Sequence, residues 1–236
     1  MTEARIESGN AAIDHTGTGW FVGHFVDPSS LRSTHDVEVK WAFHPKGDVR
    51  ASWAHATPCP CINLLVKGQT VTSFPDAEAE LSRPGDYVIW QDVPHSFSAV
   101  EDSVVLTIRW PSAAAPRHSE ASATPRVETG NAGEDNSRGW FIGHFIDASS
   151  VRSTGDVEVK WGDHPKGDVR KEWAPASDRP TLTILLKGRI VHRFPDKNVE
   201  MSKEGDYVTW TNATHTYESL EDTVTIAIRW PSVPKA

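Results

Sequence analysis

Histidine and arginine side chains stand at matched places in the two halves of this sequence, and they offer most of its chemistry. Imidazole titrates near neutral pH, so a histidine in a cavity can act as a general acid or base. A guanidinium can stabilise an enolate or a carboxylate. The candidate acid–base residues are His44, His95, His164 and His215. The candidate arginines are Arg109 and Arg229.

Tryptophan is unusually frequent, with 10 residues against 3 tyrosines. Trp53 and Trp173 occupy matched places in segments that otherwise differ between the two halves. An indole beside histidine and arginine provides a flat apolar wall that suits a planar or sugar-like small molecule. The alternative is that the tryptophans fill a core or pack between domains. Trp53 and Trp173 are therefore candidate substrate-binding residues.

Charged and apolar residues alternate in the segment VEVKWAFH. Glu38, Lys40 and His44 share one face of an extended strand there, because successive side chains point to opposite sides. Glu158 and Lys160 repeat the pattern. In one interpretation the glutamate and the lysine face solvent and form cross-strand ion pairs. In the other they point into a cavity and contact substrate, which makes both glutamates and both lysines candidate substrate contacts.

The matched residues follow from an internal duplication. Residues 19–112 align with residues 139–232 without a gap, 120 positions apart, and HPKGDVR and IRWPS occur in both copies. We predict two domains, residues 5–112 and 126–232, joined by a linker at 113–125 that is rich in Ala, Ser and Pro. The duplication resembles a covalently joined homodimer, so we expect the two copies to pack with approximate two-fold symmetry. A homodimer of the whole chain is a further option.

Each copy is predicted to be all-β. Short runs rich in valine, isoleucine and aromatic residues, such as VEVKW and VVLTIRW, are bounded by Pro and Gly, which is typical of strands. No stretch keeps a 3.6-residue apolar period long enough for a helix. Strands every 8–12 residues in a unit of about 100 residues predict a sandwich or a small barrel. The repeated HPKGDVR has the composition of a turn, and its lysine and arginine are expected to face solvent.

The order of these signals resembles the cupin family, whose fold is a double-stranded β-helix, or jelly-roll barrel. The second cupin motif is recognisable in both copies, where GDYVIW leads from Gly85 to His95 and GDYVTW leads from Gly205 to His215. The resemblance implies an all-β chain of two cupin-type jelly-roll barrels, a bicupin. It also implies that His95 and His215 point into the barrel interiors.

The first cupin motif, which carries metal ligands in the family, is degraded in this sequence. Its closing glycine matches Gly68, which places Cys61 at the position of the metal-binding glutamate and His55 near the H-x-H pair. The resemblance therefore implies, as one option, a divalent metal ion in the N-terminal barrel held by His55, Cys61 and His95. Such a soft donor set suits zinc or copper. The other option is that no metal is bound and the cysteines are small buried apolar residues.

Three functions are consistent with this pattern. The first is a small-molecule enzyme that uses His/Arg acid–base chemistry in a barrel cavity, of the isomerase, epimerase, dehydratase or lyase type. The second is a metal-dependent cupin enzyme, of the oxygenase or hydrolase type, with its site in the N-terminal barrel. The third is a non-catalytic module that binds or senses a small ligand. The sequence does not name a substrate.

Composition narrows the class of protein. The 24 Lys and Arg against 32 Asp and Glu leave a net charge of −8 with no basic cluster, which argues against a nucleic-acid partner. No apolar run approaches the ~18 residues of a membrane span, and the N-terminus lacks the order of a signal peptide. Two cysteines are too few for a disulfide framework. We expect a cytoplasmic protein that binds a small molecule and no membrane.

Overall fold

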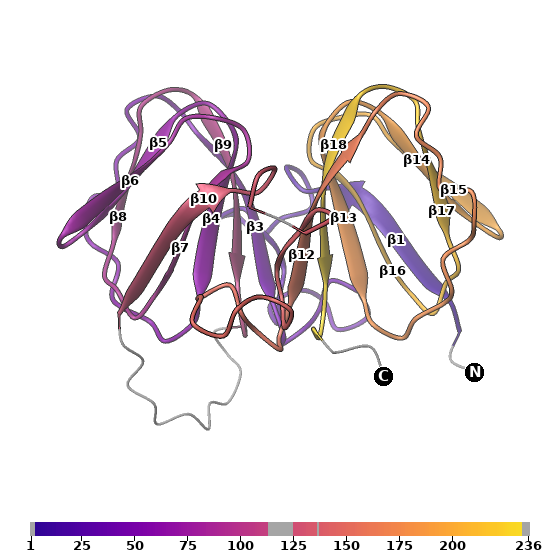
Figure 1. The fold of residues 1–236 in the computed structure, drawn as a ribbon, viewed down its shortest axis with the longest axis horizontal. Coiled ribbons are helices and arrows are strands. Elements are labelled where there is room, and N and C mark those ends of the chain that lie inside the picture. Colours follow the sequence, from indigo (N-terminus) through magenta and orange to yellow (C-terminus); the bar gives the residue numbers. More distant parts are fainter. Residues whose placement is uncertain (1–2, 113–124, 136, 233–236) are drawn as a thin grey trace.

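The computed structural model describes residues 3–112, 125–135 and 137–232, and every regular element in these residues is a β-strand (Figure 1). The all-β prediction is confirmed. Most of the predicted linker at 113–125 lies outside the described residues. The strands of the first copy are β1 (Arg5–Asn10), β2 (Trp20–Val22), β3 (Glu38–His44), β4 (Cys61–Lys67), β5 (Thr70–Phe74), β6 (Ala77–Leu81), β7 (Asp86–Gln91), β8 (Ser96–Ala99) and β9 (Ser103–Arg109). Those of the second copy are β10 (Arg126–Asn131), β11 (Trp140–Ile142), β12 (Glu158–His164), β13 (Thr181–Lys187), β14 (Ile190–Phe194), β15 (Lys197–Met201), β16 (Asp206–Thr211), β17 (Thr216–Ser219) and β18 (Thr223–Arg229).

Each barrel is a jelly roll made of one six-stranded and one three-stranded antiparallel sheet. The N-terminal barrel combines the order β10-β7-β4-β9-β3-β2 with the order β6-β5-β8. The C-terminal barrel repeats this with β1-β16-β13-β18-β12-β11 and β15-β14-β17. The six-stranded sheets face each other in the middle of the molecule, and the three-stranded sheets lie on the outside (Figure 1). No helix long and apolar enough to cross a membrane occurs in the described residues.

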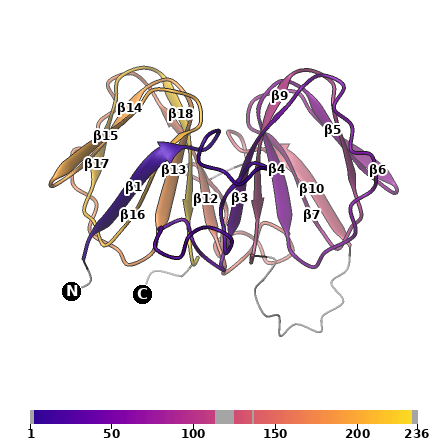
Figure 2. The ribbon, with the colours of Figure 1, turned by 180° about the vertical axis from the view of Figure 1, so that it is seen from behind.

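The two copies exchange their first strands. Strand β1 pairs with β16 of the second copy, from Arg5 opposite Thr211 to Asn10 opposite Asp206. Strand β10 pairs with β7 of the first copy in the same register (Figure 2). The division by sequence places β1 with residues 5–112, whereas its hydrogen bonds place it in the sheet of the other barrel.

A tight turn after β4 requires glycine. Gly68 has φ of 90°, and a Cβ atom there would lie 2.4 Å from the backbone oxygen of Asp102. Gly188 has φ of 87° and the same close approach to Asp222. Only glycine adopts this conformation without strain, so the turn that starts the three-stranded sheet is encoded locally in both copies.

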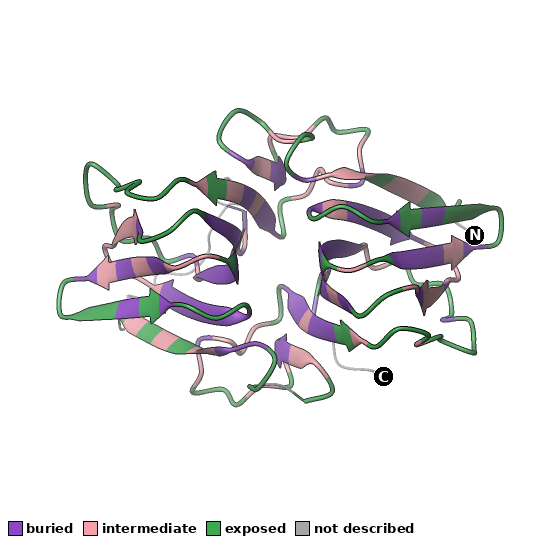
Figure 3. Ribbon diagram, turned by 90° about the horizontal axis from the view of Figure 1, so that it is seen from above, coloured by how far each residue is buried: buried purple, intermediate pink, exposed green. Residues whose placement is uncertain are grey.

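A shared hydrophobic core joins the two barrels. Trp41, Trp110, Trp161 and Trp230 are at least 93% buried in one cluster that draws residues from both six-stranded sheets. Ring contacts cross it reciprocally, with Phe21 against Tyr207 at 5.5 Å and Tyr87 against Phe141 at 5.6 Å. Figure 3 shows buried residues along the faces where the barrels meet. The expected packing of the two copies against each other is confirmed.

The central strands of each six-stranded sheet are buried on both faces. In β4, Ile62 and Leu64 belong to the shared core, whereas Cys61 and Asn63 line the interior of the N-terminal barrel. The interior also has its own apolar cluster, which includes Trp90 in the first barrel. Strand alternation therefore sends one set of side chains into the inter-barrel core and the other set into a barrel.

Candidate functional site

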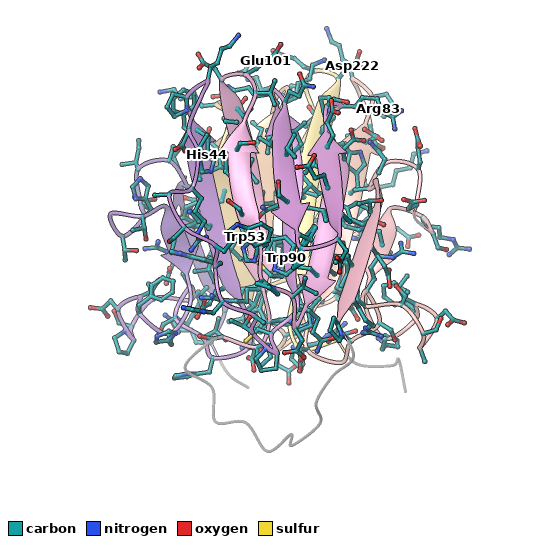
Figure 4. The ribbon with its side chains drawn as sticks, turned by 90° about the vertical axis from the view of Figure 1, so that its left-hand side faces the viewer. His44, Trp53, Arg83, Trp90, Glu101 and Asp222 are labelled. Atoms are coloured by element: carbon teal, nitrogen blue, oxygen red, sulfur yellow. The ribbon has the colours of Figure 1, made fainter. Side chains whose placement is uncertain are left out.

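A cavity of about 670 Å³ lies inside the N-terminal barrel. Side chains from β2, β3, β4, β7, β8 and β9 line it, together with the irregular segment between β3 and β4. Figure 4 shows this side of the molecule, with His44, Trp53 and Trp90 labelled. The volume suits a small molecule. The titratable residues that line the cavity are Lys40, His44, Asp48, Arg50, His55, Cys61, His95 and Arg109.

Several of the residues predicted from the sequence meet in this cavity. His44, His95, Trp53 and Lys40 all line it. Lys40 therefore faces the barrel interior, and the alternative that it lies on a solvated outer face is wrong. Trp53 is 48% exposed, and the segment that carries it is tied to the barrel by the bridge between Ala54 and His95. Its indole thus contributes a partly solvated part of the cavity wall.

Glu38 is not a cavity residue but the buried anchor of an ion-pair network. Its side chain has no exposed surface. Arg109 donates to Oε2 from Nε at 2.8 Å and from a second guanidinium nitrogen, and the hydroxyl of Ser112 donates to Oε1 at 2.6 Å. His24 reaches the same hydroxyl at 2.6 Å. The solvated interpretation of Glu38 is therefore wrong as well, because Arg109 on the neighbouring strand satisfies the carboxylate inside the protein.

Arg109 is oriented by a ring as well as by a carboxylate. Its guanidinium carbon lies 4.8 Å from the ring centroid of Trp20, which also lines the cavity. Arg109 pairs directly opposite Glu38 in the β3–β9 ladder, so the ion pair is a cross-strand contact. The guanidinium is thereby held in one place at the cavity wall.

His44 and Asp48 form a hydrogen-bonded pair on the cavity wall. His44 Nδ1 lies 2.7 Å from Asp48 Oδ2, and the imidazole packs on Phe97 at 4.5 Å between ring centroids. A carboxylate at Nδ1 fixes the proton there and leaves Nε2 as a proton acceptor. His44 was predicted from the sequence, but Asp48 was not. The turn-like composition of HPKGDVR gave no sign that Asp48 and Arg50 would line a cavity.

His95 is a neutral imidazole packed against tryptophan. Burial lowers its pKa to about 4, assisted by the positive charge of Arg50. Its ring lies 4.5 Å from that of Trp90, and it hydrogen-bonds the backbone of Val93. The expected position at the barrel interior is thus correct in geometry. At neutral pH this side chain carries no charge, so it offers hydrogen bonds rather than an imidazolium proton.

Burial also makes Lys40 easier to deprotonate than an ordinary lysine. Desolvation lowers its pKa, and the charge of Arg50 adds to the effect, while Cys61 and Asp48 oppose it. With Arg50 and Arg109, Lys40 makes three cationic groups on the cavity wall, and two carboxylates balance them in part: Asp48 on the wall and the buried Glu38, which pairs with Arg109 behind it. The sum, three minus two, leaves the cavity with one net positive charge when the histidines are neutral.

The proposed metal ligands do not fit a metal ion. His55, Cys61 and His95 do line the same cavity. Burial raises the pKa of the Cys61 thiol to about 12, so this side chain is a neutral thiol at neutral pH. In residues 3–112, 125–135 and 137–232 no group of three or more His, Cys, Asp or Glu side chains is placed to hold a metal ion.

The C-terminal barrel keeps the same framework with different details. Glu158 is 4% exposed and contacts Arg229 at 3.4 Å, but it also accepts a hydrogen bond from Arg179 at 3.2 Å. His164 pairs with Asp168 at 2.9 Å, and its Nε2 lies 3.3 Å from the hydroxyl of Thr225.

The other predicted residues of this barrel resemble their counterparts in the N-terminal barrel in exposure and in the direction of their pKa shifts. Trp173 is 48% exposed, as Trp53 is. Burial lowers the pKa of His215 to about 4, and burial also lowers the pKa of Lys160. Lys160 lies 5.9 Å from the ring of Trp140.

Comparison with known proteins shows which fold this chain has. No family model and no curated protein matches the sequence. Among solved structures, the bacterial pirin YhhW from Escherichia coli, in complex with nickel(II), superposes with a TM-score of 0.69 over 98% of this chain and 100% of that one, at 14% identity. A cupin 2 conserved barrel domain protein from Leptotrichia buccalis gives 0.55 over 98% and 91%, at 12% identity. The chain has a cupin fold.

The solved structure of an enzyme with a named reaction is similar to this chain in fold as well. Quercetin 2,3-dioxygenase from Acinetobacter baumannii gives a TM-score of 0.56 over 83% of this chain and 74% of that one, at 15% identity. Identities this low establish the cupin fold alone, and one cupin fold carries many chemistries. The resemblance drawn from GDYVIW and GDYVTW is confirmed at the level of fold.

Proposed function

We propose that the N-terminal barrel binds a small carboxylate-bearing molecule and acts on it by proton transfer, with His44 as the general base. The observation that carries this proposal is the His44–Asp48 pair on the wall of the 670 Å³ cavity. The reaction type is proton abstraction next to a carboxylate or carbonyl, as in an isomerase, epimerase, dehydratase or lyase.

The charges of the cavity support an anionic substrate. Lys40, Arg50 and Arg109 outnumber the carboxylates of Glu38 and Asp48. Arg109 is already engaged by Glu38, so Lys40 is the cation best placed to pair with an incoming carboxylate. A cation beside the reacting carbon also stabilises the enolate that forms when the proton leaves.

The remaining wall supports a substrate with a flat or apolar part. Trp20, Trp53 and Trp90 supply indole faces, and Asn63 and Thr107 supply polar contacts. Thr107 donates to Asn63 Oδ1 at 2.7 Å, which orients the amide of Asn63. His95 takes the role of a neutral hydrogen-bonding group in this proposal.

We assign proton transfer to the N-terminal barrel because its His44–Asp48 pair makes fewer hydrogen bonds to neighbouring side chains than the His164–Asp168 pair does in the C-terminal barrel. In the C-terminal barrel the hydroxyl of Thr225 lies 3.3 Å from His164 Nε2, whereas Val105 stands at that place in the N-terminal barrel. Tyr217 also donates to Asp168 at 3.2 Å, and its counterpart Phe97 has no hydroxyl. The C-terminal pair is thus hydrogen-bonded within its own barrel.

Hydrogen–deuterium exchange tests this proposal with a panel of candidate substrates. The protein is incubated in D₂O with small 2-hydroxy, 2-oxo and dicarboxylic acids, and exchange of the carbon-bound proton is followed by ¹H NMR. We expect at least one acid to exchange. His44→Gln and Asp48→Asn should slow that exchange by at least about 100-fold.

The matched variant His164→Gln provides the control, because it removes an imidazole from the other barrel. It should leave the exchange rate within about two-fold of that of the wild type. Exchange that survives His44→Gln, or that disappears equally in His164→Gln, would show that His44 is not the base. A panel acid that raises the melting temperature without any exchange would instead favour a non-catalytic ligand-binding module.

A further inference from the structure

The C-terminal barrel contains a cluster of cations that its own carboxylates do not balance. Arg179 and Arg229 both contact the buried carboxylate of Glu158, at 3.2 and 3.4 Å. Arg229 and Lys160 share one aromatic ring, lying 4.9 and 5.9 Å from the ring centroid of Trp140. These side chains come from β12, β18 and the segment before β13, and they converge on one end of the barrel.

The charge count differs between the two barrels by one. Lys160, Arg170, Arg179 and Arg229 face two carboxylates, Glu158 and Asp168, which leaves an excess of two positive charges. In the N-terminal barrel Cys59 stands where Arg179 stands in the C-terminal barrel, and the corresponding excess is one. Arg170 corresponds to Arg50, which lines the cavity of its own barrel.

One buried histidine of this barrel, His192, has ring nitrogens without hydrogen-bond partners among the described residues. His192 is 4% exposed, and the lack of a partner within the described part of the chain applies to both nitrogens. Its ring is stacked at 6.5 Å and 28° on that of His215, which hydrogen-bonds the backbone of Ala213. A neutral imidazole always carries one N–H, and leaving such a donor buried and unbonded costs about 1–3 kcal/mol.

The histidine pair and the cations belong to one interior. His215 lies within electrostatic range of both Arg170 and Arg229, and the hydroxyl of Thr216 bonds the backbone oxygen of Arg170. The N-terminal barrel has Thr72 in place of His192, so the second imidazole distinguishes the C-terminal barrel.

We propose that the C-terminal barrel binds a small doubly charged oxyanion of the phosphate class, with Lys160, Arg170 and Arg229 neutralising its charge and His192 donating a hydrogen bond to one of its oxygens. A tetrahedral dianion fits because it brings two charges and several acceptor oxygens to a site that has two surplus cations and the unbonded N–H donor of His192. The ligand is either free phosphate or a phosphate monoester. This site is separate from the one proposed for proton transfer.

Binding of inorganic phosphate to the whole chain tests the site. Isothermal titration and thermal melting are carried out at pH 7.5 with phosphate, methyl phosphate and nitrate at one constant ionic strength. We expect phosphate to raise the melting temperature and nitrate, a monoanion, to leave it unchanged. Methyl phosphate that binds more tightly than phosphate would identify a monoester as the ligand, and the reverse order would identify free phosphate.

Matched variants in the two barrels locate the site. Lys160→Gln and Arg170→Gln should weaken phosphate binding at least ten-fold, whereas Lys40→Gln and Arg50→Gln should change it by less than two-fold. Arg170 is exposed, so its variant is expected to fold, and melting without phosphate checks each variant. The proposal fails if phosphate stabilises the protein no more than nitrate does. It also fails if the variants of the N-terminal barrel weaken binding as much as those of the C-terminal barrel.

Discussion

Replacement of Arg109 by methionine tests how the buried carboxylate of Glu38 is stabilised. Glu38 has no exposed surface, and Arg109 donates two hydrogen bonds to its Oε2. Removing one partner of such a buried ion pair costs about 3–5 kcal/mol, because the other charge is left in the interior. Methionine keeps an apolar stem of similar length against Trp20, so the loss of stability in Arg109→Met is chiefly electrostatic.

The second copy supplies a matched experiment with a different expected size. In Arg229→Met the carboxylate of Glu158 keeps the guanidinium of Arg179 at 3.2 Å, so the loss is about 1.5 kcal/mol, the value of one hydrogen bond to a charged group. Both arginines lose nearly the same ring contact, 4.8 Å in the first copy and 4.9 Å in the second. We therefore expect Arg109→Met to be the more destabilising by about 2 kcal/mol, or about 4–8 °C in melting temperature.

Urea unfolding followed by tryptophan fluorescence measures the difference, and calorimetry checks the melting temperatures. The double variant Arg179→Met/Arg229→Met should fall to the stability of Arg109→Met, because Glu158 then loses both guanidinium groups. Adding Glu38→Gln to Arg109→Met should recover part of the loss by removing the buried charge. Equal losses in the two single variants, or a double variant no worse than Arg229→Met, would refute the argument that Arg179 is the reserve partner.

Three further predictions follow from other parts of the structure. Burial lowers the pKa of His95 and His215 to about 4 and that of His192 to about 3. Below pH 6.5 the unfolded chain therefore binds more protons at these histidines than the folded protein does. The free energy of unfolding should fall from pH 6.5 towards pH 4, by about 1.4 kcal/mol per pH unit for each histidine. Urea unfolding at pH 7.5, 6 and 5 measures this slope, and a His192→Thr slope equal to that of the wild type would contradict it. Gly68→Ala, where a Cβ would meet backbone oxygen at 2.4 Å, should lower the melting temperature more than Gly47→Ala, where φ is 82° but no atom lies within 4 Å. A chain that lacks residues 1–10 loses β1 from the sheet of the C-terminal barrel, and calorimetry should show that barrel unfolding first; a single transition at the wild-type temperature would count against the importance of the exchanged strand.

The fold was largely predictable because its signals are local. Strand alternation and glycine turns appear within short stretches of the sequence, the duplication is visible by direct alignment of the two halves, and the motif from Gly85 to His95 placed that histidine correctly. The exchange of β1 and β10 was not predictable in the same way. RIESGNA and RVETGNA are nearly the same, and so are the strands GDYVIW and GDYVTW with which they pair, so either pairing satisfies the same side chains.

The orientation of Glu38 and Lys40 was ambiguous for a physical reason. Alternation assigns residues to two faces but does not say which face is solvated, and here neither is. One face of the six-stranded sheet meets the other barrel, and the opposite face lines a barrel interior. Asp48 was missed for a related reason, since a turn composition describes the local backbone and not the cavity beside it.

The sequence by itself determined the all-β class, the two-fold repetition and the set of ionisable groups that each copy contributes. Those properties depend on neighbours along the chain. The tertiary structure decided that one buried glutamate pairs with an arginine in β9 while its counterpart is shared by two arginines, and that His44 finds Asp48 at a cavity wall. The glutamate–arginine contact joins segments 71 residues apart, and the energy of a buried charge depends on the groups that such packing places around it.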